Sequence, residues 1–128
     1  MALQYGTTLR NAKMNTINTT LGVTATMKIF SGAVPANCAA ADPAGTLATI
    51  NLPASPFNAA ASGAVTKNGT WSTTGSAAGI AASWRVYDGS AVCQMQGNCS
   101  TDLVFNNTNI AIGQPIDVTT FTLTSGNA

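Results

Sequence analysis

The chain has 128 residues, of which 45% are hydrophobic and 7% are charged, and it contains neither histidine nor glutamate. Acid–base catalysis, nucleophile activation and transition-metal binding depend mainly on histidine, paired carboxylates and activated cysteines, so we expect no enzyme activity, no cofactor and no metal site. The five basic residues are scattered along a chain of net charge +1, and no apolar stretch is long enough to span a bilayer. We therefore expect neither nucleic acid nor a membrane as a partner.

Residues 1–22 are expected to form an arm followed by a helix. The arm, residues 1–6, lacks the basic segment and apolar run of a secretory signal, so we expect a protein that is made and kept in the cytoplasm. Because the arm lies outside the regular elements, it is a candidate for reaching a neighbouring subunit.

Residues 7–21 carry apolar side chains three or four positions apart, which predicts the helix. Thr7 or Thr8 can cap its N-terminus, and Gly22 can end it. The expected stripe consists of Leu9, Ala12 or Lys13, Thr16 or Ile17, and Leu21, with Met14 beside it. We expect the helix to pack on its own domain; the alternative is that it lies across a partner subunit.

Short strands separated by turns are expected from residue 23 onward. The first two are 26–31 and 46–52, separated by a loop at 32–45 that contains two prolines and has no hydrophobic period. After an irregular connection at 54–62, residues 63–72 are expected to hold one strand around Val65 and another that approaches Trp71.

The clearest local pattern lies at 80–87, where Trp84 and Val86 alternate with Arg85 and Tyr87. Asp88-Gly89 then predicts a hairpin turn into a strand at 91–96. Turns are expected at 97–101 and 106–109. Two further strands are expected, at 102–105 and 116–124, with a short apolar piece at 110–112 between them.

The last of these strands is long and alternates, which places Phe121 and Leu123 on one face and Val118 and Thr120 on the other. Threonine, valine and isoleucine suit such strands, and asparagine, glycine, proline and aspartate suit the turns between them. The chain is therefore expected to be all-β: a β-sandwich or jelly-roll of about eight short strands with one N-terminal helix. Residues 23–128 would form the sandwich, and the whole chain one domain.

The three cysteines, Cys38, Cys93 and Cys99, are odd in number and lack the spacing of metal ligands. We expect free thiols; the alternative is a bridge between Cys93 and Cys99.

Trp71, Trp84 and Tyr87 have two interpretations. They could form a stacking platform for a sugar, but the alternation around Trp84 favours a place in the core. Asp88-Gly89-Ser90 lacks further carboxylates at the spacing of a calcium loop, so we interpret it as a turn.

Several segments, taken in order and spacing, resemble a group of small virion proteins of tailed bacteriophages. They are LRN at 9–11, MKIFSG at 27–32 with PAN at 35–37, LATINL at 47–52, WRVYD at 84–88 and VTTFTLTSGN at 118–127. Such proteins are similar to head decoration or cement proteins, which bridge coat subunits on the outside of the capsid. Cys93 and Cys99 depart from the family pattern.

The resemblance implies a structural protein of the capsid surface, assembled in the host cytoplasm, that binds the major capsid protein and self-associates as a dimer or trimer. The alternative is a tail or fibre component that binds a host glycan through exposed aromatic residues. The expected intersubunit contacts lie at the two ends of the chain and on the helix: Met1, Ala2, Leu3, Gln4, Tyr5, Arg10, Lys13, Gly126, Asn127 and Ala128.

Overall fold

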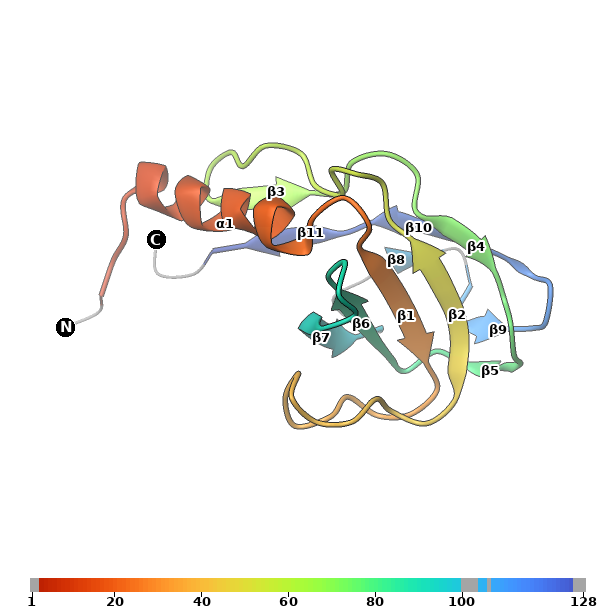
Figure 1. The fold of residues 1–128 in the computed structure, drawn as a ribbon. Helices are drawn as coiled ribbons and strands as arrows, with labels where there is room; N and C mark the ends of the chain where they lie inside the picture. Colours follow the sequence, from red (N-terminus) through yellow and green to blue (C-terminus); the bar gives the residue numbers. More distant parts are fainter. Residues whose placement is uncertain (1–2, 100–103, 106, 126–128) are drawn as a thin grey trace.

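A computed structural model describes residues 3–99, 104–105 and 107–125. These residues form one helix and eleven short strands, which confirms a mainly β fold with an N-terminal helix (Figure 1). The elements are α1 (Thr7–Leu21), β1 (Thr26–Phe30), β2 (Thr46–Asn51), β3 (Ala64–Thr66), β4 (Ser72–Thr74), β5 (Gly79–Ile80), β6 (Ser83–Tyr87), β7 (Cys93–Asn98), β8 (Val104–Phe105), β9 (Asn109–Ile110), β10 (Pro115–Thr120) and β11 (Thr122–Thr124). Within this part of the chain, no helix is long and apolar enough to cross a membrane.

The largest sheet has four antiparallel strands in the order β2-β1-β6-β7. The predicted hairpin joins β6 to β7, and Asp88 closes its turn by accepting hydrogen bonds from the backbone N–H groups of Ser90 and Val92. The expected turn at 97–101 begins too early, because β7 continues to Asn98. In this sheet β7 is an edge strand.

Three smaller antiparallel sheets complete the described part: β4-β10-β8, β11-β3 and β5-β9. The expected long strand at 116–124 is in fact two strands, β10 and β11, which pair with different partners. A bulge between Val118 and Thr120 adds one residue against β8, so the alternation shifts by one position. Val118 and Phe121 are consequently both buried, and the prediction that they lie on opposite faces was wrong.

Four aromatic side chains form the centre of the core. The Phe121 ring lies between the other three, with centroid distances of 5.7 Å to Phe57, 5.4 Å to Trp71 and 5.0 Å to Trp84. Phe121 stands at the junction of β10 and β11, and Trp84 belongs to β6 of the largest sheet. The cluster therefore packs the smaller sheets against the largest one.

The bounds predicted for the helix are correct, and Ile17, Leu21 and the flanking Met14 pack on the core as expected, but the expected N-terminal cap and the first half of the stripe are not observed. Gly6 occupies the N-cap position, and no side chain forms a capping hydrogen bond, so Thr7 and Thr8 do not have the expected role. At the other end Gly22, with a φ of 73°, donates its N–H to the carbonyl of Asn18, as predicted. Leu9 is 51% exposed.

Three asparagines hold the helix against the segment at 57–63. The Asn11 and Asn15 side-chain oxygens accept hydrogen bonds from the backbone N–H groups of Gly63, at 2.7 Å, and Ala60, at 2.8 Å. The Asn18 side chain accepts from the N–H of Phe57 at 3.1 Å and donates to its carbonyl at 2.8 Å. Because these amides must face the 57–63 segment, the helix packs on its own chain through Met14, Ile17 and Leu21.

Candidate functional site

The outer face of the largest sheet, opposite the aromatic core, carries polar side chains from β6. Ser83, Arg85 and Tyr87 lie on this face, as the alternation predicts, yet all three are buried. The loop at 32–45 covers them, and Gly32 at its start accepts a hydrogen bond from the Ser83 hydroxyl at 2.7 Å. Both faces of β6 are therefore enclosed, one by the core and the other by a loop.

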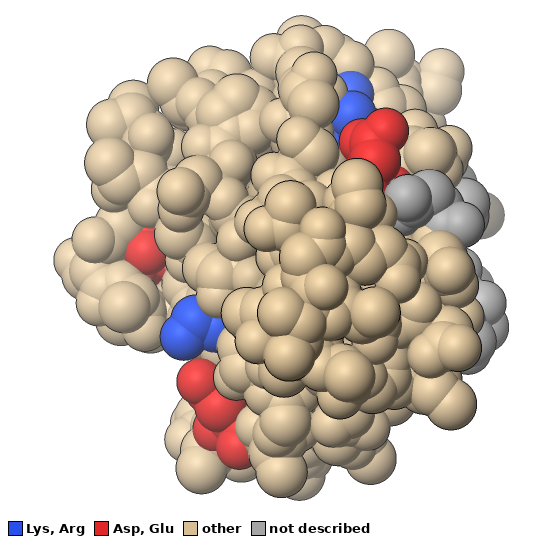
Figure 2. Space-filling model, turned by 90° about the vertical axis from the view of Figure 1, so that its right-hand side faces the viewer, with Lys and Arg blue, Asp and Glu red and all other residues tan. Residues whose placement is uncertain are grey.

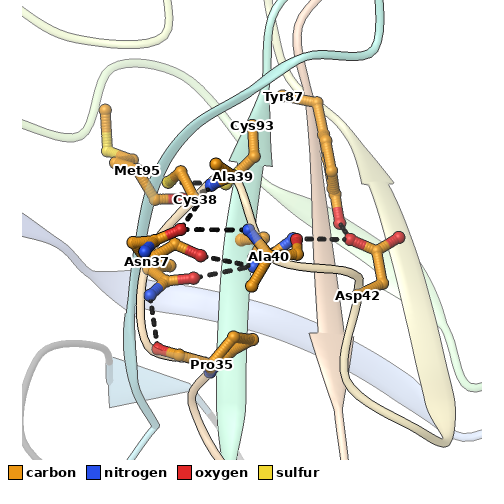
Figure 3. A network of polar contacts seen from close by, with 11 residues as sticks. Pro35, Asn37, Cys38, Ala39, Ala40, Asp42, Tyr87, Cys93 and Met95 are labelled. Atoms are coloured by element: carbon orange, nitrogen blue, oxygen red, sulfur yellow. Dashed lines mark hydrogen bonds and ion pairs between the residues drawn. The ribbon is translucent and has the colours of Figure 1, made fainter.

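Arg85 is the centre of a polar network beneath this loop. Figure 3 shows the loop residues of this network, Asn37, Ala40 and Asp42. Its guanidinium, 1% exposed, donates to the carbonyls of Asn37 and Ala40, each at 3.0 Å, and to the side chain of Gln96 at 3.1 Å. It also forms an ion pair with Asp42 at 2.9 Å. The buried charge is thus compensated by one carboxylate and three neutral oxygens, which fix the loop on the sheet.

Tyr87 adds a second donor to the Asp42 carboxylate, at 2.6 Å. This hydrogen bond, together with the neighbouring Arg85 guanidinium, holds the pKa of Asp42 below its ordinary value despite some desolvation. Burial and the same hydrogen bond raise the pKa of Tyr87 above its ordinary value. The network therefore favours an ionised aspartate beside a neutral tyrosine, which suits a structural clamp.

The positions of the cysteines do not support a bridge between Cys93 and Cys99. Cys93, at the start of β7, lies beside Cys38 of the covering loop, with 2.7 Å between the sulfur atoms (Figure 3). Cys99 is buried with the core residues. The structure thus brings Cys93 to Cys38, and the suggested pairing of Cys93 with Cys99 was wrong.

A groove of about 450 Å³ lies between α1, β7 and β11. Its lining residues are Met14, Ile17, Trp84, Gln94, Met95, Gln96, Thr122, Leu123 and Thr124, and we call this surface the β7–β11 groove. A smaller hollow of about 110 Å³ adjoins it and shares Ile17, Gln94 and Met95. The two strands beside the groove, β7 and β11, are edge strands of their sheets. No charged residue lines either hollow.

Trp84 contributes an unpaired donor to the lining of this groove. Its side chain is 2% exposed, and within the described residues its indole N–H has no hydrogen-bond partner. An unmade hydrogen bond at a buried donor costs roughly 1–3 kcal/mol. The uncharged lining of the groove suits neutral groups.

The structure places the expected contact residues in different environments. Leu3 and Gln4 are exposed on the arm, which extends away from the strands (Figure 1). Tyr5 is half-buried, with the Lys13 ammonium 4.2 Å from its ring centre. Arg10 donates to the carbonyl of Ser125 at 3.1 Å, so it joins the helix to the end of the β11 segment. The remaining expected contacts, Met1, Ala2, Gly126, Asn127 and Ala128, lie outside the described residues.

The aromatic residues considered for sugar stacking belong to the interior. Trp71, Trp84 and Tyr87 are all buried, so the stacking-platform interpretation of these three residues was wrong. In the described ranges, Tyr5 is the one aromatic side chain that is not buried. These ranges also contain no group of three or more cysteines and carboxylates placed to hold a metal ion.

Comparison with models of known protein families, with curated proteins and with solved structures finds no match to this chain.

Few features of the sequence predict these sites. Asp42 and Arg85 are 43 positions apart, and the groove combines residues from four elements. One signal was available: Asn11, Asn15 and Asn18 are spaced like the residues of one helix face.

Proposed function

We propose that this protein is a structural protein of a tailed-phage virion that decorates the outer surface of the capsid and cements neighbouring coat subunits. Its partners would be the major capsid protein and further copies of itself, as a dimer or trimer, after assembly in the host cytoplasm. The observation that carries the proposal is an almost uncharged surface whose few charges are largely engaged within the chain.

The charged side chains have intramolecular contacts in most described cases. Besides the pairing of Arg85 with Asp42, Lys28 lies 5.2 Å from the Tyr87 ring centre, and Lys67 donates to the carbonyl of Gly69. Asp88 holds its own hairpin turn. On the face drawn in Figure 2 the charged residues lie in a few small groups of opposite sign, and wide uncharged areas separate these groups.

Such a surface suits repeated contacts with other protein. Burying neutral groups avoids the desolvation cost of lysine, arginine and carboxylates, and interfaces are depleted of charge at their centres. Large apolar side chains are exposed at Leu3, Leu9, Val23, Val34, Ile80, Val92 and Ile112. Contacts that are weak individually become strong when one particle presents them many times.

We also propose that the sheets form a β-sandwich of the jelly-roll type. In support, the four-stranded sheet and the β4-β10-β8 sheet contribute to one core, in which Trp84 and Trp71 both contact Phe121. Antiparallel sheets with one buried face commonly pack in this way.

Copy number in purified virions tests the proposed function. A decoration protein is expected in nearly equimolar amount with the coat subunit, measured by densitometry of a denaturing gel. Because the surface is nearly uncharged, purified protein should rebind stripped capsids with similar affinity at about 0.1 M and about 1 M NaCl. A faint band of a few copies per particle would instead favour a tail component, and steep loss of binding with salt would contradict a neutral interface.

Removal of the arm tests the expected contacts at the N-terminus. A variant in which one Met replaces residues 1–5 keeps Gly6 and the whole of α1, so its Tm should change little. We expect its affinity for stripped capsids to fall about tenfold or more, because Leu3 and the exposed part of the Tyr5 ring offer apolar area to a neighbour. The matched control is Thr8→Ala, an exposed helix position. Unchanged capsid binding by the truncated variant would exclude the arm as a contact.

A further inference from the structure

Cys38 and Cys93 are held opposite each other by different parts of the fold. Cys93 begins β7, next to Tyr87 of β6 in the sheet register. Cys38 belongs to the covering loop, where the Asn37 side chain accepts hydrogen bonds from the N–H groups of Ala39 and Ala40 at 3.0 and 3.1 Å. The residues on both sides of Cys38 are therefore fixed, and its thiol is presented to Cys93.

The separation of the two sulfur atoms is 2.7 Å. A disulfide bond is about 2.05 Å long, so the sulfur atoms need to approach by less than about 1 Å. Both cysteines are partly exposed, whereas Cys99 is buried. Geometry and access thus single out one pair among the three thiols.

We propose that Cys38 and Cys93 form a disulfide when the protein meets an oxidising thiol–disulfide pool, and that Cys99 takes no part in this bond. The bond would join the loop at 32–45 covalently to the edge strand β7, beside the Arg85 network. Its formation depends only on contacts within the chain, whatever the protein binds.

The exchange balances with oxidised glutathione as the electron acceptor. The Cys38 thiolate attacks one glutathione sulfur, the glutathione disulfide breaks, and one glutathione leaves as a thiolate. Cys93 then loses its proton to solvent, and its thiolate attacks the Cys38 sulfur of the mixed disulfide. The second glutathione leaves as a thiolate, which takes up a proton from solvent. Two protein thiols are oxidised, and one glutathione disulfide is reduced to two thiols.

The order of these steps follows from the environment of Cys93. Burial, together with the hydrogen bond to Cys38, raises the pKa of Cys93 to about 12. Cys93 is therefore mostly protonated at neutral pH, so it is the weaker nucleophile for a first attack on glutathione. It attacks in the second step, which is intramolecular, after losing its proton to solvent.

The bond is expected to raise thermal stability. It closes a loop between residues 55 positions apart, which restricts the unfolded chain more than a short loop would. For a chain of this size we expect the Tm to rise by roughly 10 °C relative to the reduced protein.

The test uses the purified full-length chain incubated with oxidised glutathione at neutral pH. We expect the intact mass to fall by two hydrogen atoms, and a non-reduced peptide map to link Cys38 to Cys93 with Cys99 alkylated only after unfolding. Cys99→Ser should keep the bond and the Tm rise, whereas Cys38→Ser, a change in a loop, should lose both. A linked Cys93–Cys99 peptide, a persistent glutathione adduct, a bond between two chains, or a wholly reduced chain would each overturn the proposal.

Discussion

Phe121→Ala is expected to lower the free energy of unfolding by about 3–5 kcal/mol, the range found for truncating a large buried aromatic side chain. The Phe121 ring contacts Phe57, Trp71 and Trp84 at the point where β10 gives way to β11. Its removal leaves a cavity between the smaller sheets and the largest one, and three rings lose their shared contact.

Urea denaturation followed by tryptophan fluorescence measures the effect, because Trp71 and Trp84 both lie against Phe121. Phe121→Leu refills part of the cavity and should lose less. The control is Thr120→Ala, an exposed neighbour, for which we expect a change within about 0.5 kcal/mol. Equal losses for Phe121→Ala and Thr120→Ala would show that the aromatic cluster does not organise the core.

Asp42→Asn should destabilise the fold by roughly 2–3 kcal/mol, because it leaves the buried Arg85 guanidinium without its carboxylate. The expected loss is below that of a fully buried pair, since the Asp42 side chain is 44% exposed and the pair is partly screened by solvent. Asparagine keeps an oxygen for the Tyr87 hydroxyl, so the change acts mainly on charge.

A double variant separates charge compensation from packing. Asp42→Asn with Arg85→Met removes both charges and retains much of the side-chain volume. We expect it to be more stable than Asp42→Asn alone, because no uncompensated charge remains buried. A double variant that is less stable by the sum of the two single losses would mean that the ion pair itself contributes little to the cost.

The ion pair of Asp42 and Arg85 also predicts how the stability of the fold decreases at acidic pH. The pKa of Asp42 is lowered by folding, so its contribution is complete above the ordinary value of 3.8 and is lost as the pH falls through the folded value. Asp88 has a lowered pKa as well, owing to the hydrogen bonds of its turn. Denaturation at several pH values between about 2 and 7 measures the free energy of unfolding as a function of pH. We expect this free energy to fall less steeply in acid for Asp42→Asn than for the wild type, because the variant keeps only the contribution of Asp88.

Several elements could be predicted from the sequence because they depend on residues close together in the chain. The periodicity at 7–21 and Gly22 define a helix with the observed ends. Asp88-Gly89 predicts the hairpin, since a tight turn between two alternating runs is itself a local structure. The bulge in β10 could not be predicted, because an added residue is defined only against the partner strand.

The candidate sites could not be predicted, because they depend on contacts between residues that are far apart in the sequence. The alternation places Arg85 on the outer face of a strand. Only the folded loop at 32–45 shows that it is buried against Asp42. The pairing of Cys93 with Cys38 has the same origin. The β7–β11 groove combines residues of α1, β6, β7 and β11, which are distant from one another in the sequence.

By itself, the sequence determined the class of fold, the helix, the main hairpin and the shortage of charge, all of which follow from local preference and composition. Only the tertiary structure decided where the few charges go, which cysteines meet and which aromatic residues are enclosed. The physical reason is that burial and charge compensation depend on the covering segment, and the loop that covers β6 is distant from it in the chain.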